Sequence, residues 1–116
     1  MIFLENCIFC KILKGEIPSK KVYEDDLVYA FHDIQPAAPV HILIIPKEHL
    51  CCLNEAKTSH QALLGHILLT AQKLAKELGV AEGGYRIINN CGENAGQTVF
   101  HLHFHLLAGD TFTKLV

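Results

Sequence analysis

The sequence predicts an α+β domain with a mainly antiparallel sheet of five strands, one long helix and one short helix. Two observations lead to this fold class. Short β-rich runs are separated by turn residues, and they do not alternate regularly with helices as strands do in parallel α/β folds. The 116 residues are enough for one hydrophobic core, and we find no linker or internal repeat, so we expect a single domain over residues 1–116.

Residue patterns in the N-terminal half of the sequence predict the short helix and three of the strands. Apolar residues at helical spacing indicate a short helix over residues 7–14. The third strand is wholly apolar, as expected for a buried strand. The three β-rich runs are residues 21–24, 27–32 and 41–45.

The C-terminal half predicts the long helix and the last two strands. An apolar stripe indicates a helix over residues 59–78, with Thr58 or Ser59 as its N-cap and Gly79 as its left-handed stop. The stripe consists of Leu63, Leu64, Ile67, Leu68, Ala71, Leu74, Ala75 and Leu78. The fourth and fifth strands are expected at residues 85–90 and 99–107.

Composition excludes several partners. The net charge is −2 and the basic residues are scattered, so no positive field is available for nucleic acid or an anionic membrane. No apolar run approaches the roughly 20 residues of a membrane span, and no basic leader precedes an apolar segment, so we expect a cytoplasmic protein. The five cysteines are therefore expected as reduced thiols.

Three of the eight histidines alternate along the fifth predicted strand. Alternate side chains of a strand share a face, so His101, His103 and His105 are expected to line one face over about 13 Å. Two functional interpretations are open. Either His101 and His103 are ligands of one catalytic metal, or His103 is a nucleophile, with His105 assisting proton transfer or contacting a phosphoryl oxygen and Thr98 bonding the leaving group.

Cys7 and Cys10 have the spacing of half a zinc site. A tetrahedral site needs two more ligands, and His49 and His101 complete a Cys₂His₂ set if the fold brings them close. Such a closed site is structural, because it leaves no position for water. The alternative is a pair of unlinked core cysteines. The remaining cysteines, Cys51, Cys52 and Cys91, are expected as structural thiols.

An ordered set of motifs resembles the histidine-triad superfamily and, within it, the Hint branch. The set spans residues 5–109, nearly the whole chain. Its segments are Gly96-Gln97-Thr98-Val99-Phe100-His101-Leu102-His103-Phe104-His105-Leu106-Leu107, Cys7-Ile8-Phe9-Cys10-Lys11-Ile12, Gly15-Glu16-Ile17-Pro18, Ala30-Phe31-His32-Asp33-Ile34, Pro39-Val40-His41, Ile45-Pro46-Lys47-Glu48-His49 and Gly84-Tyr85-Arg86 ahead of Asn90.

The resemblance implies a fold and an activity. The implied fold is a five-stranded antiparallel sheet that continues across a homodimer. The implied activity is hydrolysis of purine nucleoside phosphoramidates or aminoacyl-adenylates through a nucleotidyl-histidine intermediate, giving the nucleoside monophosphate. Two alternatives stay open: a hydrolase or transferase acting on dinucleoside polyphosphates, and a nucleotide-binding interaction module without catalysis.

The resemblance also implies residue roles. His103 matches the nucleophile, His105 and His41 match the supporting histidines, and Thr98 stands where many relatives have serine. Asp33 matches the residue that binds the ribose hydroxyls. The remaining implied roles are the phosphate side for Asn90 and Gln97, the base pocket for Ile8, Phe9, Phe31 and Ile34, and a structural Zn²⁺ for Cys7, Cys10, His49 and His101. Residues 110–116 lack the Trp-Pro-Pro-Gly ending of some relatives, so the leaving group stays undetermined.

Overall fold

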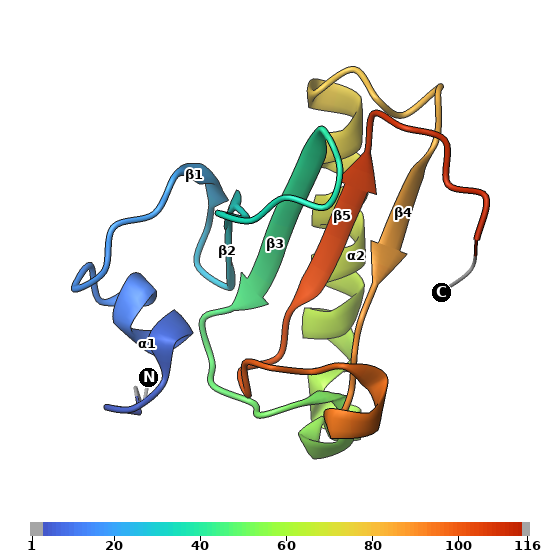
Figure 1. Cartoon of the computed structure of the whole chain (residues 1–116). Coiled ribbons are helices and arrows are strands. Elements are labelled where there is room, and N and C mark those ends of the chain that lie inside the picture. The colour runs from blue at the N-terminus through green and yellow to red at the C-terminus, as the bar shows by residue number, and fades with distance from the viewer. Residues whose placement is uncertain (1–3, 115–116) are drawn as a thin grey trace.

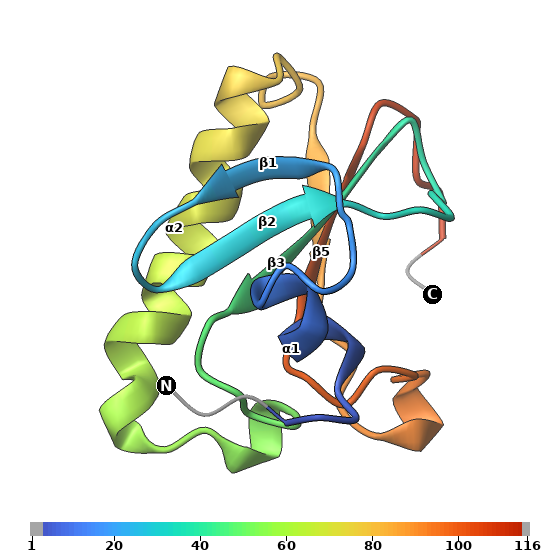
Figure 2. The same ribbon diagram turned by 90° about the vertical axis from the view of Figure 1, so that its left-hand side faces the viewer.

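The sheet has five antiparallel strands in the order β1-β2-β3-β5-β4, which confirms the predicted fold class (Figure 1). The structure is a computed structural model and describes residues 4–114. The strands are β1 (Lys21–Glu24), β2 (Val28–His32), β3 (Val40–Pro46), β4 (Tyr85–Ile88) and β5 (Phe104–Ala108). The first two form the hairpin that faces the viewer in Figure 2.

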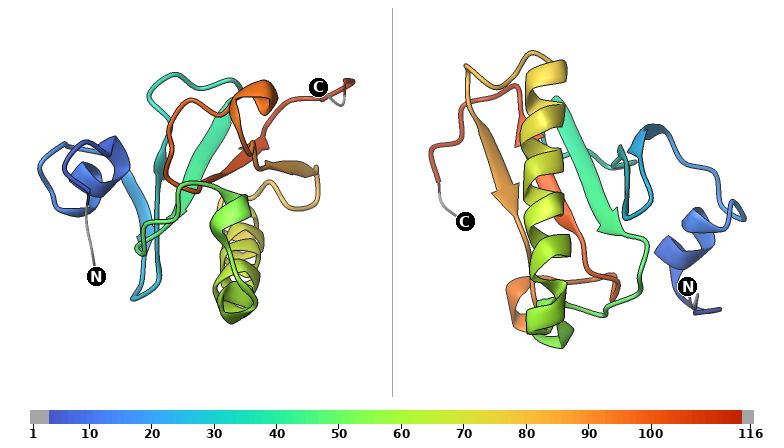
Figure 3. Two further views of the ribbon diagram at one scale, coloured as in Figure 1. Left: turned by 90° about the horizontal axis from the view of Figure 1, so that it is seen from below. Right: turned by 180° about the vertical axis from the view of Figure 1, so that it is seen from behind.

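Two helices accompany the sheet. The long helix α2 (Gln61–Glu77) lies along one face of the sheet, as the view from behind in Figure 3 shows. The short helix α1 (Ile8–Leu13) packs beside β2 and β3 through the buried residues Phe9 and Cys10. No helix within residues 4–114 is both long and apolar enough to cross a membrane.

The alternation of strand residues divides the interior into two clusters. Ile42 and Ile44 of β3 point to the α2 side, whereas Leu43 and Ile45 point to the α1 side. His41 shares the α1 side by the same alternation. His105 pairs directly with Leu43 across the ladder between β3 and β5, so it lies on this face too. The sheet itself therefore brings His41 and His105 together.

The last strand begins later than the sequence predicts. It starts at Phe104, not at residue 99, so the expectation that three histidines line one face of a strand is wrong. The chain before it is held by a loop contact, because the Leu102 amide donates to the Leu50 carbonyl rather than to a sheet neighbour. His101 and His103 are thus free to turn toward different surroundings.

The predicted N-cap of the long helix is also wrong. A 3₁₀ turn, Thr58–His60, precedes Gln61, and neither hydroxyl caps the helix. Instead, the His60 Nδ1 accepts the Lys57 amide at 2.9 Å. The stop at Gly79 is confirmed by its φ of +74°.

Two residues of the predicted apolar stripe lie outside the core. Leu68 is 47% exposed and Leu78 is 41% exposed. Leu69, which is not part of the stripe, is 63% exposed. The remaining leucine, isoleucine and alanine side chains of the stripe pack in the interior. The long helix therefore presents leucines to solvent as well as to the sheet.

Candidate active site and metal centre

A main-chain carbonyl fixes the orientation of the His103 ring. The His103 Nδ1 lies 2.7 Å from the carbonyl oxygen of His101, and a carbonyl only accepts, so the proton sits on Nδ1. In the neutral ring the Nε2 atom then carries the free lone pair. Burial lowers the pKa of His103 below its usual value, which keeps this lone pair available near pH 7. His103 therefore has the protonation state of a nucleophile.

A second chain of hydrogen bonds fixes His41 and His105. The Ala37 amide donates to His41 Nδ1 at 2.9 Å, so the proton of neutral His41 is on Nε2. That Nε2 lies 2.9 Å from His105 Nδ1 and donates to it. The proton of neutral His105 is then on its own Nε2. Burial lowers the pKa of His105 to about 4 and also lowers the pKa of His41, so both rings are neutral near pH 7.

Asp33 lies at the end of this chain. Its Oδ2 is 3.4 Å from His41 Nε2, and its Oδ1 accepts the Gln35 amide at 2.8 Å. Asp33, His41 and His105 are close enough together to suggest metal ligands. The hydrogen bonds argue against that interpretation, because both nitrogens of His41 are already engaged. We interpret His41 and His105 as a hydrogen-bonded relay, with the Asp33 carboxylate close beside it.

An open cavity of about 320 Å³ adjoins the relay. Its lining includes five of the residues expected to bind substrate and also Thr98: Ile8, Phe9, Phe31, Asp33, Ile34 and Thr98. The Phe9 ring packs edge-on against His103, with centroids 5.2 Å apart, so it connects the apolar lining to the candidate nucleophile. The cavity thus combines an apolar wall, a carboxylate and a hydroxyl.

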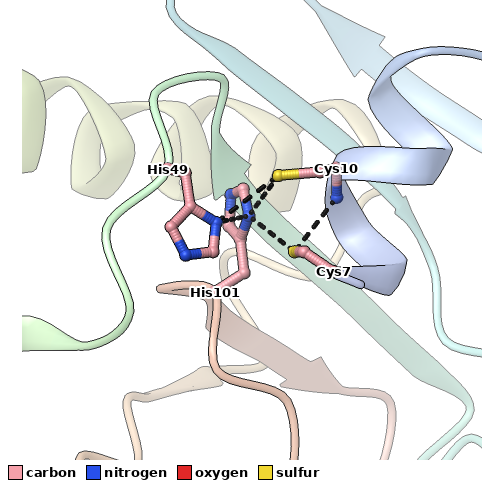
Figure 4. Close-up of side chains that lie close together, drawn as sticks. All are labelled: Cys7, Cys10, His49 and His101. Atoms are coloured by element: carbon pink, nitrogen blue, oxygen red, sulfur yellow. Dashed lines mark hydrogen bonds between the residues drawn. The ribbon is translucent and has the colours of Figure 1, made fainter. Parts of the chain in front are cut away.

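The other cluster contains Cys7, Cys10, His49 and His101, whose side chains converge in Figure 4. The two Nδ1 atoms of the histidines are 3.1 Å apart, and Cys10 Sγ lies 3.4 Å from His49 Nδ1. The Nδ1 of His101 lies 3.4 Å from Cys7 Sγ and 3.7 Å from Cys10 Sγ. The fold therefore brings together the four residues that the sequence predicts as ligands.

These separations fit a tetrahedral zinc site. Zinc–nitrogen and zinc–sulfur bonds of about 2.0 and 2.3 Å imply ligand atoms about 3.3 to 3.8 Å apart in a tetrahedron. The donors are also oriented for a metal, because His101 Nε2 donates to the Pro46 carbonyl at 2.9 Å and leaves Nδ1 facing the sulfurs. A buried thiol usually resists ionisation, and burial does raise the pKa of Cys10 when no metal is present. The donor set fits a divalent metal.

Two predicted phosphate-side residues lie in different surroundings. The buried Gln97 uses its amide on the main chain, accepting from the Gly92 amide at 2.8 Å and donating to the carbonyls of Cys51 and Val99. Gln97 thus holds its loop in place. Asn90 is half-buried, and its phosphate role stays a prediction.

Sequence reasoning missed three contributors to the site. Asn89 donates to the His103 carbonyl at 2.9 Å, and the main chains of Ala37 and Pro46 orient His41 and His101. Main-chain partners carry no residue signature, so no sequence pattern points to them. One sequence feature could have pointed to Asn89: it is a polar residue directly after an apolar strand.

Comparison with known proteins identifies the family. The model of the HIT domain matches residues 14–112. The chain belongs to the HIT family. It is 50% identical over 105 residues to the purine nucleoside phosphoramidase of Escherichia coli K12, covering 90% of this chain and 88% of that protein.

Solved structures agree with this assignment. A histidine triad protein from Clostridium difficile superimposes with a TM-score of 0.95 at 48% identity, covering 99% of this chain and all of that one. A HIT family hydrolase from Clostridium thermocellum gives 0.93 at 57% identity, covering 97% and 99%. The predicted resemblance to the histidine-triad superfamily is confirmed, and these relatives support assignment of the chain as a hydrolase.

Proposed function

We propose that this HIT protein is a nucleotide-binding hydrolase that cleaves purine nucleoside phosphoramidates or aminoacyl-adenylates through a nucleotidyl intermediate on His103. One observation carries the proposal: the hydrogen bond from His103 Nδ1 to the His101 carbonyl leaves Nε2 as a free, neutral nucleophile on a ring that packs against Phe9 of the cavity lining. The E. coli relative named as a purine nucleoside phosphoramidase supports the choice of substrate class.

The first step forms a bond between His103 Nε2 and the α-phosphorus and breaks the phosphorus–nitrogen bond of a phosphoramidate. The departing amine leaves as a neutral molecule only if it gains a proton. Thr98 supplies a hydroxyl at the cavity wall, and the Nε2–H of His105 is the other donor beside His103. Donors arranged around the phosphoryl oxygens stabilise the charge of the transition state.

In the second step, water attacks the nucleotidyl-histidine and His103 departs as a neutral imidazole. Two displacements at phosphorus each have a workable leaving group, which is the advantage of covalent catalysis. His105 is the acid of the first step and, once deprotonated, the base for this water. The products are the nucleoside monophosphate and the free amine, or the free amino acid when an aminoacyl-adenylate is the substrate.

The cavity residues offer two kinds of contact to a nucleoside, apolar contacts to the base and a carboxylate to the ribose. Phe9 and Phe31 are buried beneath the apolar wall, and Ile8 and Ile34 are exposed at its rim, which suits the flat faces of a purine. The Asp33 carboxylate retains free acceptor capacity, which suits two neighbouring ribose hydroxyls.

We further propose that Cys7, Cys10, His49 and His101 hold a structural Zn²⁺. When bound, the ion supplies cross-linking and no chemistry, because four protein ligands close its coordination sphere. His101 would then serve both sites. Its ring would be one of the four zinc ligands, and its main-chain carbonyl orients His103. The zinc cluster joins α1 to the chain that precedes β5.

A homodimer is the third part of the proposal. The edge strand β4 pairs with β5 on one side only in the described chain, and α2 exposes Leu68 and Leu69. An unpaired strand edge and exposed leucines are features that a second copy covers. Size-exclusion chromatography with light scattering should give twice the mass of the chain, and Leu69→Asp should shift it toward the monomer.

Mass spectrometry after rapid mixing with an adenosine phosphoramidate tests the chemistry. We expect a transient adduct of one adenylyl group on His103, formed as the amine is released and lost as the monophosphate appears. Diadenosine polyphosphates measured in parallel distinguish the dinucleotide hydrolase. Nucleotide binding without any adduct or product would contradict the proposal and favour the non-catalytic module.

A further inference from the structure

Three cysteines lie outside both histidine clusters. Cys51 and Cys52 lie in the chain between β3 and α2, and Cys91 follows β4. The Cys51 thiol donates to Cys52 Sγ at a separation of 3.2 Å. All three are free thiols and partly exposed, so small oxidants have access to them.

The hydrogen bonds make Cys52 the nucleophile of the three. The Cys51 thiol donates to its sulfur across 3.2 Å. This hydrogen bond is the main cause that lowers the pKa of Cys52, against a smaller opposing effect of burial. The thiolate is the reactive form of cysteine, so Cys52 is expected to react first.

Cys51 of this pair is also bonded to the loop that carries Thr98. The Gln97 side chain donates to the Cys51 carbonyl at 2.8 Å and to the Val99 carbonyl at 3.0 Å, while its oxygen accepts the Gly92 amide. Gln97 is only 5% exposed. The Cys51 carbonyl therefore forms part of the support of the loop directly before the active-site strand.

We propose that Cys51 and Cys52 form a peroxide-responsive dithiol that closes as a disulfide and thereby weakens the active site. In the first step the Cys52 thiolate attacks a hydroperoxide, forming a sulfur–oxygen bond and breaking the oxygen–oxygen bond, with release of an alcohol or water. The Cys51 thiol then displaces the oxygen as water and forms the disulfide. One hydroperoxide is reduced by two electrons and two thiols are oxidised.

Closure must move the Cys51 carbonyl. The sulfurs have to approach from 3.2 Å to a bond of about 2.05 Å, and the ring that forms contains the peptide bond between Cys51 and Cys52. The carbonyl that Gln97 binds belongs to that same peptide bond. Ring closure therefore turns this carbonyl away from Gln97 and loosens the support of the Thr98 loop.

The test uses the zinc-loaded wild-type protein, limiting hydrogen peroxide and peptide mapping by mass spectrometry. We expect loss of two hydrogen masses from the peptide with Cys51 and Cys52, reversed by dithiothreitol. Cys52→Ser should abolish this product. Cys51→Ser should stop at a sulfenic acid on Cys52 that a dimedone reagent captures. Cys91→Ser, the matched control, should still form the disulfide.

The functional effect rests on the proposed hydrolase activity, so it needs its own measurement. A displaced Thr98 loop should lower phosphoramidate turnover at least about tenfold, with recovery on reduction. The Gln97 side-chain amide signals in NMR should shift on oxidation even if no substrate is turned over, which separates failure of this inference from failure of the proposed function. First oxidation at Cys7 and Cys10, a disulfide from Cys52 to Cys91, or unchanged Gln97 signals in the oxidised pair would overturn it.

Discussion

His101 and His103 are two residues apart, yet the fold gives their rings opposite hydrogen bonds. His101 donates from Nε2 to the Pro46 carbonyl, so its free Nδ1 faces two sulfurs and His49. His103 donates from Nδ1 to the His101 carbonyl, so its Nε2 is left free for chemistry. The comparison teaches that the role of each ring depends on which of its nitrogens donates to a main-chain carbonyl. Its position in the alternating sequence of three histidines does not decide that role.

The variant with the largest expected effect removes the free nitrogen of the catalytic cluster. His103→Ala should lower kcat/KM for an adenosine phosphoramidate at least about a hundredfold, the scale of nucleophilic or acid–base catalysis. Zinc content should change little, because the ring is not in the metal cluster. His60→Ala, a histidine outside both clusters, is the control and should keep its activity. Near-normal turnover of His103→Ala would remove the basis of the proposed mechanism.

The matching change in the other cluster should affect stability first. Cys10→Ala removes one of four ligands from a fully buried position, and partial sites bind zinc weakly. We expect loss of stoichiometric zinc and a fall of at least about 8 °C in the thermal midpoint. Metal analysis and calorimetry check this result, with His103→Ala as the variant that keeps its zinc. Full zinc occupancy in Cys10→Ala would contradict the ligand set.

A smaller effect separates binding from chemistry within the catalytic cluster. Asp33→Asn should raise KM for a ribonucleotide substrate about tenfold with a lesser change in kcat, since hydrogen bonds to a charged group contribute about 1.5–3 kcal/mol. A substrate without ribose hydroxyls provides the control, because wild type and variant should then have similar KM values. An equal loss for both substrates would assign Asp33 to the relay with His41 instead.

The smallest effect concerns the pH dependence of folding. The pKa of His105 is about 4 in the folded protein against 6.5 as its ordinary value, because burial disfavours its charged form. Between these values the unfolded chain binds a proton that the folded chain does not, so stability is complete above pH 6.5 and falls as the pH falls toward 4. We expect a loss of about 1 kcal/mol between pH 7 and 5, reduced for partial exposure.

Denaturant titrations at several pH values measure this loss. His105→Asn keeps a polar side chain of similar shape and cannot titrate, so its stability should depend less on pH over the same range. A wild-type protein that becomes more stable on acidification from pH 7 to 5 would show that the buried imidazoles carry charge at neutral pH.

Much of the fold follows from local patterns. The first strand has its predicted bounds at Lys21 and Glu24, and the stop of the long helix at Gly79 is correct, because β alternation and the glycine conformation are local properties. The start of β5 was missed because Val99 to His103 have a strand-like composition, whereas tertiary contacts of Leu102 and His101 take this segment out of the sheet.

The candidate site, like the fold, could be predicted only in part. The four residues of the metal cluster were predictable, because their types and spacing carry a signature, and the fold brings them together. The ring orientations were not predictable, since they depend on the carbonyls of Pro46 and His101 and on the Ala37 amide. The pairing of His66 with Asp25 at 2.7 Å was missed because helix and hairpin meet only in the folded chain.

The protonation pattern of the imidazole nitrogens tests the central claim most directly. Long-range ¹H–¹⁵N correlation spectra of the histidine-labelled, zinc-loaded protein at pH 7 distinguish a nitrogen that carries a proton from one with a free or metal-bound lone pair. We predict that His103 carries its proton on Nδ1 and His101 carries its proton on Nε2. The same tautomer at both residues, or a doubly protonated His103, would contradict the account.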